Sequence, residues 1–277
     1  MIDLDALTTA AEALEPLPAS VTRLAVLATA NEPQIDEVVE VVRFDQALTA
    51  ALLATANSTW SASRTRITTV RDAVVRLGTG PVLSLALGSA VRTRMHRALP
   101  EYGLAEGELW EHSVAALLAA ELLNRHAPAR PPVESATAAL LHDVGKLVMA
   151  RFLDDELLSL LHRAAEQGVG RRAAEMEALG VDHAELGGLV AQTWRLPPSL
   201  VRGIGYHHDP VLGGDLICHA VHLADVVAKI VGAGLEDNPD LEAYAAAVDA
   251  LGLGPDDVDE LCRLVDERFV EVTRRFT

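Results

Sequence analysis

Hydrophobic residues recur along this chain at the spacing of an α-helix. Val70, Ala73, Val74 and Leu77 fall on one helical stripe, and Gly78 follows as a stop signal. A stripe of this width is typical of a helix that buries one face against a core. The same rhythm predicts helices over residues 37–42, 48–56, 114–123, 136–152, 216–231 and 255–275.

Loop signals separate these segments, and no stretch alternates between apolar and polar residues for long enough to predict a β-sheet. The sequence therefore predicts an all-α protein. Clusters of Gly, Pro, Asn, Asp and Ser mark the connections at residues 31–33, 57–58, 78–81, 127–132, 196–198 and 237–240.

A break in the helical pattern divides the chain near residues 98–108, where Pro100, Gly103 and Gly107 occur. No histidine precedes His96, whereas all the candidate metal ligands described below follow the break. We therefore predict an N-terminal helical part over residues 1–100 and a second helical part over residues 101–277 that carries the functional site.

The composition narrows the classes of function. Half of the 277 residues are hydrophobic and only 4% are aromatic, so the core consists mainly of Leu, Val and Ala. Lys and Arg number 23 against 40 Asp and Glu, a formal net charge of −17. Such a charge repels phosphate backbones and anionic lipids, so neither nucleic acid nor a membrane is an expected partner.

The N-terminus lacks the basic and apolar regions of a signal peptide. The longest uncharged run, residues 77–91, is too short to span a bilayer. The two cysteines, Cys218 and Cys262, are too few for a disulfide framework and have no metal-ligand spacing. These features predict a cytoplasmic protein.

The densest candidate chemistry lies in the segment 140–146, Leu-Leu-His-Asp-Val-Gly-Lys. Imidazole nitrogens and carboxylate oxygens are the ligands of zinc, iron, manganese and nickel sites. Asp143 and Lys146 share a helical face, and Gly145 between them offers a place where a ligand can approach the backbone. Further candidate ligands occur before and after this segment: His112, His183, His207, His208 and Asp225.

Several of these residues match a known signature. His112, His142-Asp143, Gly145-Lys146 and Asp225 resemble the H…HD…D pattern of the HD superfamily of metal-dependent phosphohydrolases. The N-terminal half is similar to the HDOD family, the HD-related output domain of bacterial signalling proteins. That similarity rests on Leu17-Pro18, on residues 45–49 and 52–58, on the run from Ile67 to Gly78, and on residues 109–113.

The resemblance implies an N-terminal helical bundle packed on an HD-type helical bundle, and a role in signal transduction. By resemblance to the HD-GYP phosphodiesterases of cyclic di-GMP, His183 and the pair His207-His208 would complete a second metal position. The chain departs from that group after His208, where it reads Asp-Pro-Val-Leu-Gly-Gly and lacks the GYP signature. Cyclic di-GMP is therefore not an expected substrate.

Under a dinuclear hypothesis, Asp143 is shared between two divalent ions. His112, His142 and Asp225 would hold one ion, and His183 with one or both of His207 and His208 would hold the other. Asp143 and Lys146 would be the catalytic residues, with Lys146 stabilising charge on a phosphoryl group or pairing with a nearby acid. Carboxylates that orient the imidazoles could be Glu111 or Glu185. His219 and His222 remain possible auxiliary ligands, one helical turn apart.

Three functional interpretations remain open. The first is a signalling module that holds a metal and acts through protein contacts made by its N-terminal helices. The second is an active phosphohydrolase or phosphodiesterase acting on a nucleotide or cyclic nucleotide. The third is a helical scaffold with vestigial ligands. A groove over the metal position would favour the second interpretation over the first.

Overall fold

The computed structural model describes residues 4–30, 32–58, 66–233 and 240–276 of the chain. These residues form helices and no β-strand, apart from an isolated bridge between Leu99 and Leu104, which confirms the all-α prediction. The first helices are α1 (Leu4–Glu12), α2 (Ala19–Ala28), α3 (Ile35–Arg43), α4 (Gln46–Ala56), α5 (Val70–Leu77) and α6 (Thr79–Met95).

The predicted break at residues 98–108 contains a short 3₁₀ helix, η2 (Pro100–Tyr102), and ends where α7 begins. The helices that follow are α7 (Glu108–His126), α8 (Ser135–Leu141), α9 (Lys146–Met149), α10 (Asp155–Glu166), α11 (Arg171–Leu179), α12 (His183–Thr193), α13 (Pro198–Gly205), α14 (Pro210–Gly213), α15 (Leu216–Ile230), α16 (Leu241–Leu251) and α17 (Pro255–Phe276).

Local sequence explains several helix ends. Thr69 caps α5, its hydroxyl accepting from the amide of Asp72, and Asp45 caps α4 in the same way. At the start of α12, Asp182 and Glu185 form a capping box, each side chain bonding the other's backbone amide. This box fixes the first turn of α12, whose first residue is the predicted ligand His183.

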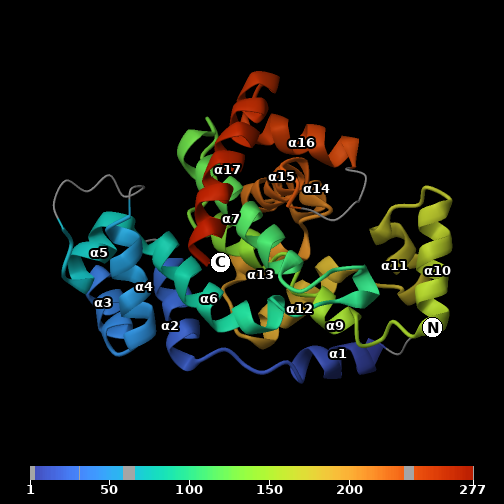
Figure 1. Ribbon diagram of the computed structural model, residues 1–277, viewed down its shortest axis with the longest axis horizontal. Helices are drawn as coiled ribbons and strands as arrows, with labels where there is room; N and C mark the ends of the chain where they lie inside the picture. Colours follow the sequence, from blue (N-terminus) through green and yellow to red (C-terminus); the bar gives the residue numbers. More distant parts are fainter. Residues whose placement is uncertain (1–3, 31, 59–65, 234–239, 277) are drawn as a thin grey trace.

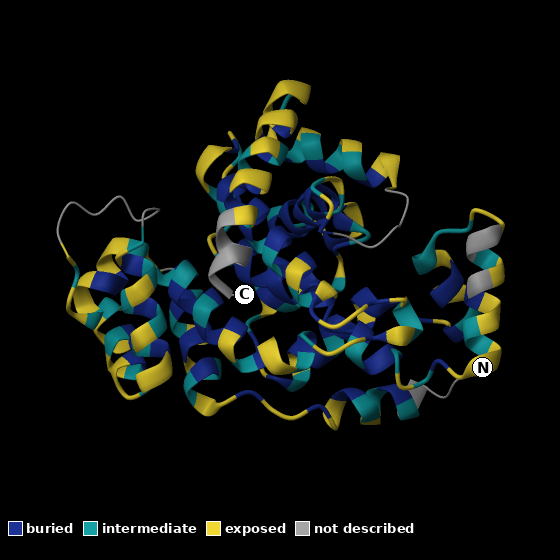
Figure 2. Cartoon of the chain, viewed as in Figure 1, coloured by how far each residue is buried: buried dark blue, intermediate teal, exposed yellow. Residues whose placement is uncertain are grey.

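The helices α7 and α15 form the centre of the molecule, where they pack against each other and against α8 (Figure 1). Their inward faces are almost fully buried, and α16 and α17 cover them from outside (Figure 2). Small residues allow this close approach: α7 buries four alanines and α15 buries three. The rigid centre therefore carries His112 on α7 and Asp225 on α15.

At one end of the molecule α2 to α6 pack together, and α6 contacts α8 (Figure 1). The helix α1 lies apart from this bundle, because it runs along the second part and packs on α12 and α9. Leu7 and Ala11 are buried in that contact. The first helix of the chain thus lies beside the helices that carry the predicted site, and the division at residue 100 stays a prediction.

Within the part of the chain that the structure describes, no single helix is long and apolar enough to cross a membrane. Together α5 and α6 have the length and composition that such a span needs, but the two helices are bent by 109° relative to each other.

Candidate metal centre

The predicted ligands His142 and Asp143 lie at a break between two helices. Periodicity predicted one helix over residues 136–152, and this prediction is wrong, because α8 ends at Leu141 and α9 begins at Lys146. In between, the amide of Lys146 donates to the carbonyl of Asp143 at 3.0 Å, the i→i−3 bond of a 3₁₀ turn. The turn brings both side chains into one cluster, with 3.4 Å between His142 Nε2 and Asp143 Oδ2.

A first group of three donor side chains comes from three helical segments. His112 belongs to α7, His142 follows α8 and Asp225 belongs to α15. The Nε2 atoms of His112 and His142 are 3.1 Å apart. Asp225 Oδ1 lies 3.1 Å from His112 Nε2 and 3.5 Å from His142 Nε2. All three side chains are buried. The structure thus brings together residues more than one hundred positions apart that the sequence placed in one ligand set.

The hydrogen bonds of these imidazoles define which nitrogen faces the cluster. His112 Nδ1 lies 2.6 Å from the carbonyl oxygen of Ala233, and His142 Nδ1 lies 2.7 Å from that of Ala139. A carbonyl only accepts, so both Nδ1 atoms carry hydrogen, and in the neutral form of each ring Nε2 presents a lone pair to the cluster. Two lone pairs 3.1 Å apart, with a carboxylate oxygen beside them, repel each other unless a cation or a proton lies between them. The donor set therefore fits a metal ion.

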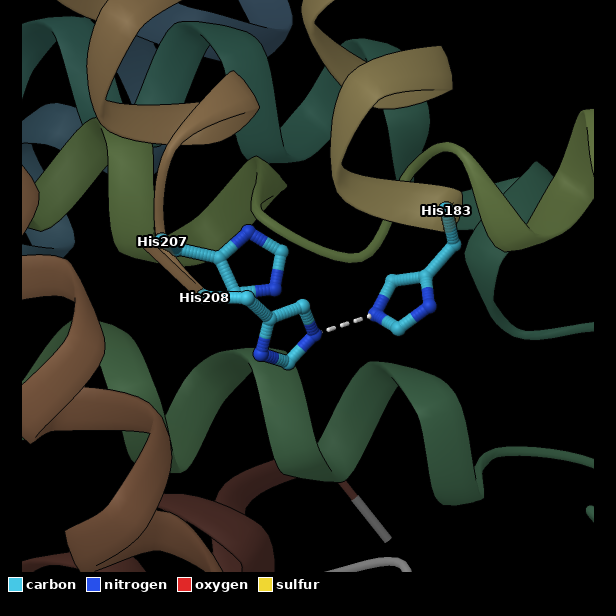
Figure 3. A group of neighbouring side chains, drawn as sticks. All are labelled: His183, His207 and His208. Atoms are coloured by element: carbon cyan, nitrogen blue, oxygen red, sulfur yellow. Dashed lines mark hydrogen bonds between the residues drawn. The ribbon is translucent and has the colours of Figure 1, made fainter. Parts of the chain in front are cut away.

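A second group consists of His183, His207 and His208 (Figure 3). His183 is the first residue of α12, and the other two follow α13. The Nε2 atoms of His183 and His208 are 2.9 Å apart. His207 donates from Nδ1 to the carbonyl of Ile204 at 2.7 Å, so its buried Nε2 is left without a partner. Donor atoms of the three rings lie within 4.8 Å of one another.

Asp143 lies between the two groups. Its Oδ2 faces the first group, at 3.4 Å from His142 Nε2 and 3.6 Å from His112 Nε2. Its Oδ1 faces the second group, at 3.3 Å from His183 Nε2. A carboxylate with one oxygen toward each group is placed as a shared ligand of two ions requires.

Two lysines hold the carboxylates of the cluster in the charged form. Lys146 Nζ lies 2.6 Å from Asp143 Oδ2, and Lys229 Nζ lies 2.9 Å from Asp225 Oδ2. Burial alone would raise the pKa of Asp143, but His142 and Lys146 hold it well below its usual range. Burial would likewise raise the pKa of Asp225. Lys229 and the neighbouring histidines outweigh this effect and hold that pKa well below its usual range. Both acids are therefore ionised at neutral pH.

The three imidazoles of the second group differ in charge. Burial, then the neighbouring histidines, hold the pKa of His207 and His208 well below the ordinary value, so both rings are neutral and able to ligate. Burial would also lower the pKa of His183, but Glu175 and Asp143 raise it to about 9. His183 is therefore the protonated imidazole of the second group at neutral pH.

Glu175 is the functional residue that the sequence did not predict. This residue lies on α11 and is fully buried. Its Oε2 lies 2.7 Å from His183 Nδ1 and also accepts a hydrogen bond from the amide of His183 at 3.0 Å. The hydroxyl of Tyr102 donates to Oε1 at 3.0 Å. Glu175 therefore orients His183, as carboxylates commonly orient metal-binding imidazoles. The sequence feature that could have indicated its burial is its place on the apolar stripe of α11, next to Ala174 and one turn from Leu179.

The structure gives other roles to the carboxylates and auxiliary histidines considered from sequence. Glu111 is exposed, and Glu185 belongs to the capping box of α12, so neither is placed to orient a cluster imidazole. His222 Nδ1 donates to the carbonyl of His207 at 2.8 Å and thereby supports the backbone of the second group. Neither His219 nor His222 belongs to the convergent donor groups found among the described residues.

The fold is similar to those of solved structures of other bacterial proteins. A candidate phosphohydrolase from Shewanella amazonensis SB2B is 25% identical, with a TM-score of 0.67 over 95% of this chain and 93% of that chain. A candidate signal transduction protein from Marinobacter aquaeolei VT8 has a TM-score of 0.68 at 24% identity, over 98% of this chain and 63% of that chain. The latter likeness shows the fold alone.

A curated relative, an uncharacterised protein from Treponema pallidum (strain Nichols), is 25% identical over 177 residues. That match covers 64% of this chain and 34% of the relative, so the chain spans about a third of the relative's length. The model of the HDOD domain matches residues 14–210, which is more than half of the chain. The histidine and aspartate cluster therefore lies in a protein that belongs to the HDOD family.

Proposed function

We propose that this chain is a bacterial signal-transduction module that holds one or two divalent metal ions and acts by contacting a signalling protein. The observation that carries the proposal is the closure of the donor cluster. His112, His142 and Asp143 are each 1% exposed, His183 is 2% exposed and His207 is fully buried. Only His208 is half-buried. A site this closed favours a sensing or structural metal over one that receives a nucleotide.

The neighbouring loop does not account for this closure. Val211 and Leu212 of α14 are 67% and 75% exposed, so their side chains face solvent. The cluster is instead enclosed by the helices that carry it. Opening it would require α12 or the turn after α13 to move, and such a movement is a suitable link between the metal and a partner-binding surface.

The N-terminal bundle offers exposed apolar side chains for a partner. Val26 of α2, Phe44 after α3 and Val75 of α5 are 57%, 77% and 60% exposed. Exposed apolar groups on an acidic protein are suited to contacts with another protein. These residues support the proposed output through the N-terminal helices.

A divalent ion at this centre would supply Lewis acidity and lower the pKa of a coordinated water. The chain itself supplies the remaining functions. Backbone carbonyls and Glu175 keep hydrogen on Nδ1 and direct Nε2 inward, while Lys146 neutralises Asp143. Mixed imidazole and carboxylate donors suit iron, zinc, manganese or nickel.

The test is elemental analysis of untagged protein and of the His142→Ala, Asp143→Ala double variant. We expect one or two equivalents of metal in the native protein and none in the variant, because the variant removes His142 from the first group and the carboxylate that faces both groups. The control is His126→Ala, which removes an exposed histidine from α7. No bound metal after anaerobic reconstitution, or equal metal in the double variant, would contradict the proposal.

A phosphohydrolase is the second candidate, favoured by the position of Asp143 between the two donor groups. Lys146 would then act on the phosphoryl group in addition to pairing with Asp143. The metal-loaded protein and the Lys146→Met variant can be compared with bis(p-nitrophenyl) phosphate as the substrate. Hydrolysis that disappears in the variant would establish this activity, whereas the signalling module is expected to show none.

A further inference from the structure

A groove lies on the surface of the second part, apart from the donor cluster. It runs between the end of α12, α13 and α14 and has a volume of about 510 Å³. Sites for small organic molecules fall in this range of volume. Its lining includes Gln192, Leu196, Val201, Arg202, Tyr206 and Leu212.

The walls of the groove expose apolar and aromatic surface to solvent. Leu212 is 75% exposed and Tyr206 is 40% exposed. Val211, next to Leu212 on the short helix α14, is 67% exposed. A cluster of large exposed apolar side chains around a concavity is a feature of binding sites. The groove therefore offers a surface for the apolar body of a ligand.

The charge that lines this groove is positive. Arg202 is the charged residue among its lining residues, and its side chain is 47% exposed. The guanidinium donates to the carbonyl of Gly213, and Asp215 lies 3.9 Å away, itself 41% exposed. Such an exposed pair is weak, so the guanidinium remains able to bind an anion. On a chain of net charge −17, a cation that lines a groove with exposed apolar walls favours an anionic group.

We propose that this groove is a second ligand site, which takes a small amphipathic anion with an aliphatic or aromatic body. The anionic head would pair with Arg202, and the body would lie against Leu196, Tyr206 and Leu212. The site goes beyond the proposed function, because nothing in it requires a metal. Its position is informative: Tyr206 directly precedes His207, so an occupant would touch the turn that carries two imidazoles of the centre.

The experiment uses the full chain, stripped of metal, and 8-anilinonaphthalene-1-sulfonate as a fluorescent aromatic anion. Decanoate, decyl phosphate and decanol are the competitors. We expect saturable binding of the probe, displacement by the two anions, and little displacement by decanol. Whichever anion displaces the probe at the lower concentration identifies the head group, a carboxylate or a phosphate.

Two variants locate the site. Arg202→Gln and Leu212→Asp are each expected to weaken binding of the probe about tenfold, the effect of losing one charge-assisted contact or one apolar wall. Matched controls are Arg97→Gln and Leu160→Asp, which change an exposed cation and an exposed apolar side chain remote from the groove. Circular dichroism verifies that each variant is folded. Absent binding, equal displacement by decanol, or equal losses in the control variants would overturn the proposal.

Discussion

Replacing Gly145 by alanine should destabilise the protein by about 3 kcal/mol or more, at the upper end of the cost of overpacking a core. A Cβ at this position would lie 1.9 Å from the carbonyl oxygen of His183 and 2.6 Å from the amide nitrogen of Gly187. Both atoms belong to the backbone of α12, which cannot rotate out of the way as a side chain can. The whole helix would have to move, and the 3.3 Å contact between His183 and Asp143 would be lost.

Urea unfolding and metal content of the Gly145→Ala variant measure both effects. Gly205→Ala is the matched control, because a Cβ there would meet its nearest neighbour, Gly188 Cα, at an ordinary 3.5 Å. We expect the control to keep both stability and metal. Native-like stability of Gly145→Ala would show that α12 does not pack against the turn as described.

Replacing Glu175 by glutamine is expected to weaken metal binding at the second donor group about 10- to 100-fold, the usual cost of losing a carboxylate that orients an imidazole ligand. The carboxylate bonds both the ring and the amide of His183. Glutamine keeps the size but removes the charge and one acceptor. Glu111→Gln, which changes an exposed acid beside His112, is the control and should leave the affinity unchanged.

The pH dependence provides a second measurement on the same variant. In the native chain the pKa of His183 is about 9, so a metal ion that binds below this pH must displace a proton. Affinity at the second group should therefore rise about tenfold per pH unit and level off near pH 9. Without the charge of Glu175 the pKa of His183 falls, and the increase should level off at a lower pH. Equal profiles for the native protein and Glu175→Gln would contradict the role assigned to Glu175.

The hydrophobic pattern located several of the helices because burial of an apolar face is a local property of the sequence. The stripe from Val70 to Leu77 corresponds to α5, and the pattern over residues 216–231 corresponds to α15. The pattern failed at residues 142–145, which are also buried and therefore look helical. There the backbone tightens into a 3₁₀ turn, and the backbone of α12 packs directly against Gly145.

Gly145 illustrates the limit of sequence reasoning. We expected its missing side chain to admit a ligand, but the structure places the backbone of α12 in that space. Glu175 illustrates the same limit, because the sequence did not reveal its role. Its place on an apolar stripe indicated burial but not contact with His183, and Glu185, which lies closer to His183 along the chain, caps α12 instead.

The sequence by itself determined the helical class, the HDOD resemblance and the types of donor side chain, because these depend on periodicity and residue identity. The tertiary structure alone decided how these donors, already assigned to two groups, converge and are oriented. His112 and Asp225 meet only because α7 packs on α15, and the inward direction of Nε2 depends on acceptors as distant as Ala233. Convergence of side chains depends on the relative placement of whole helices, and that placement follows from the packing of the entire core.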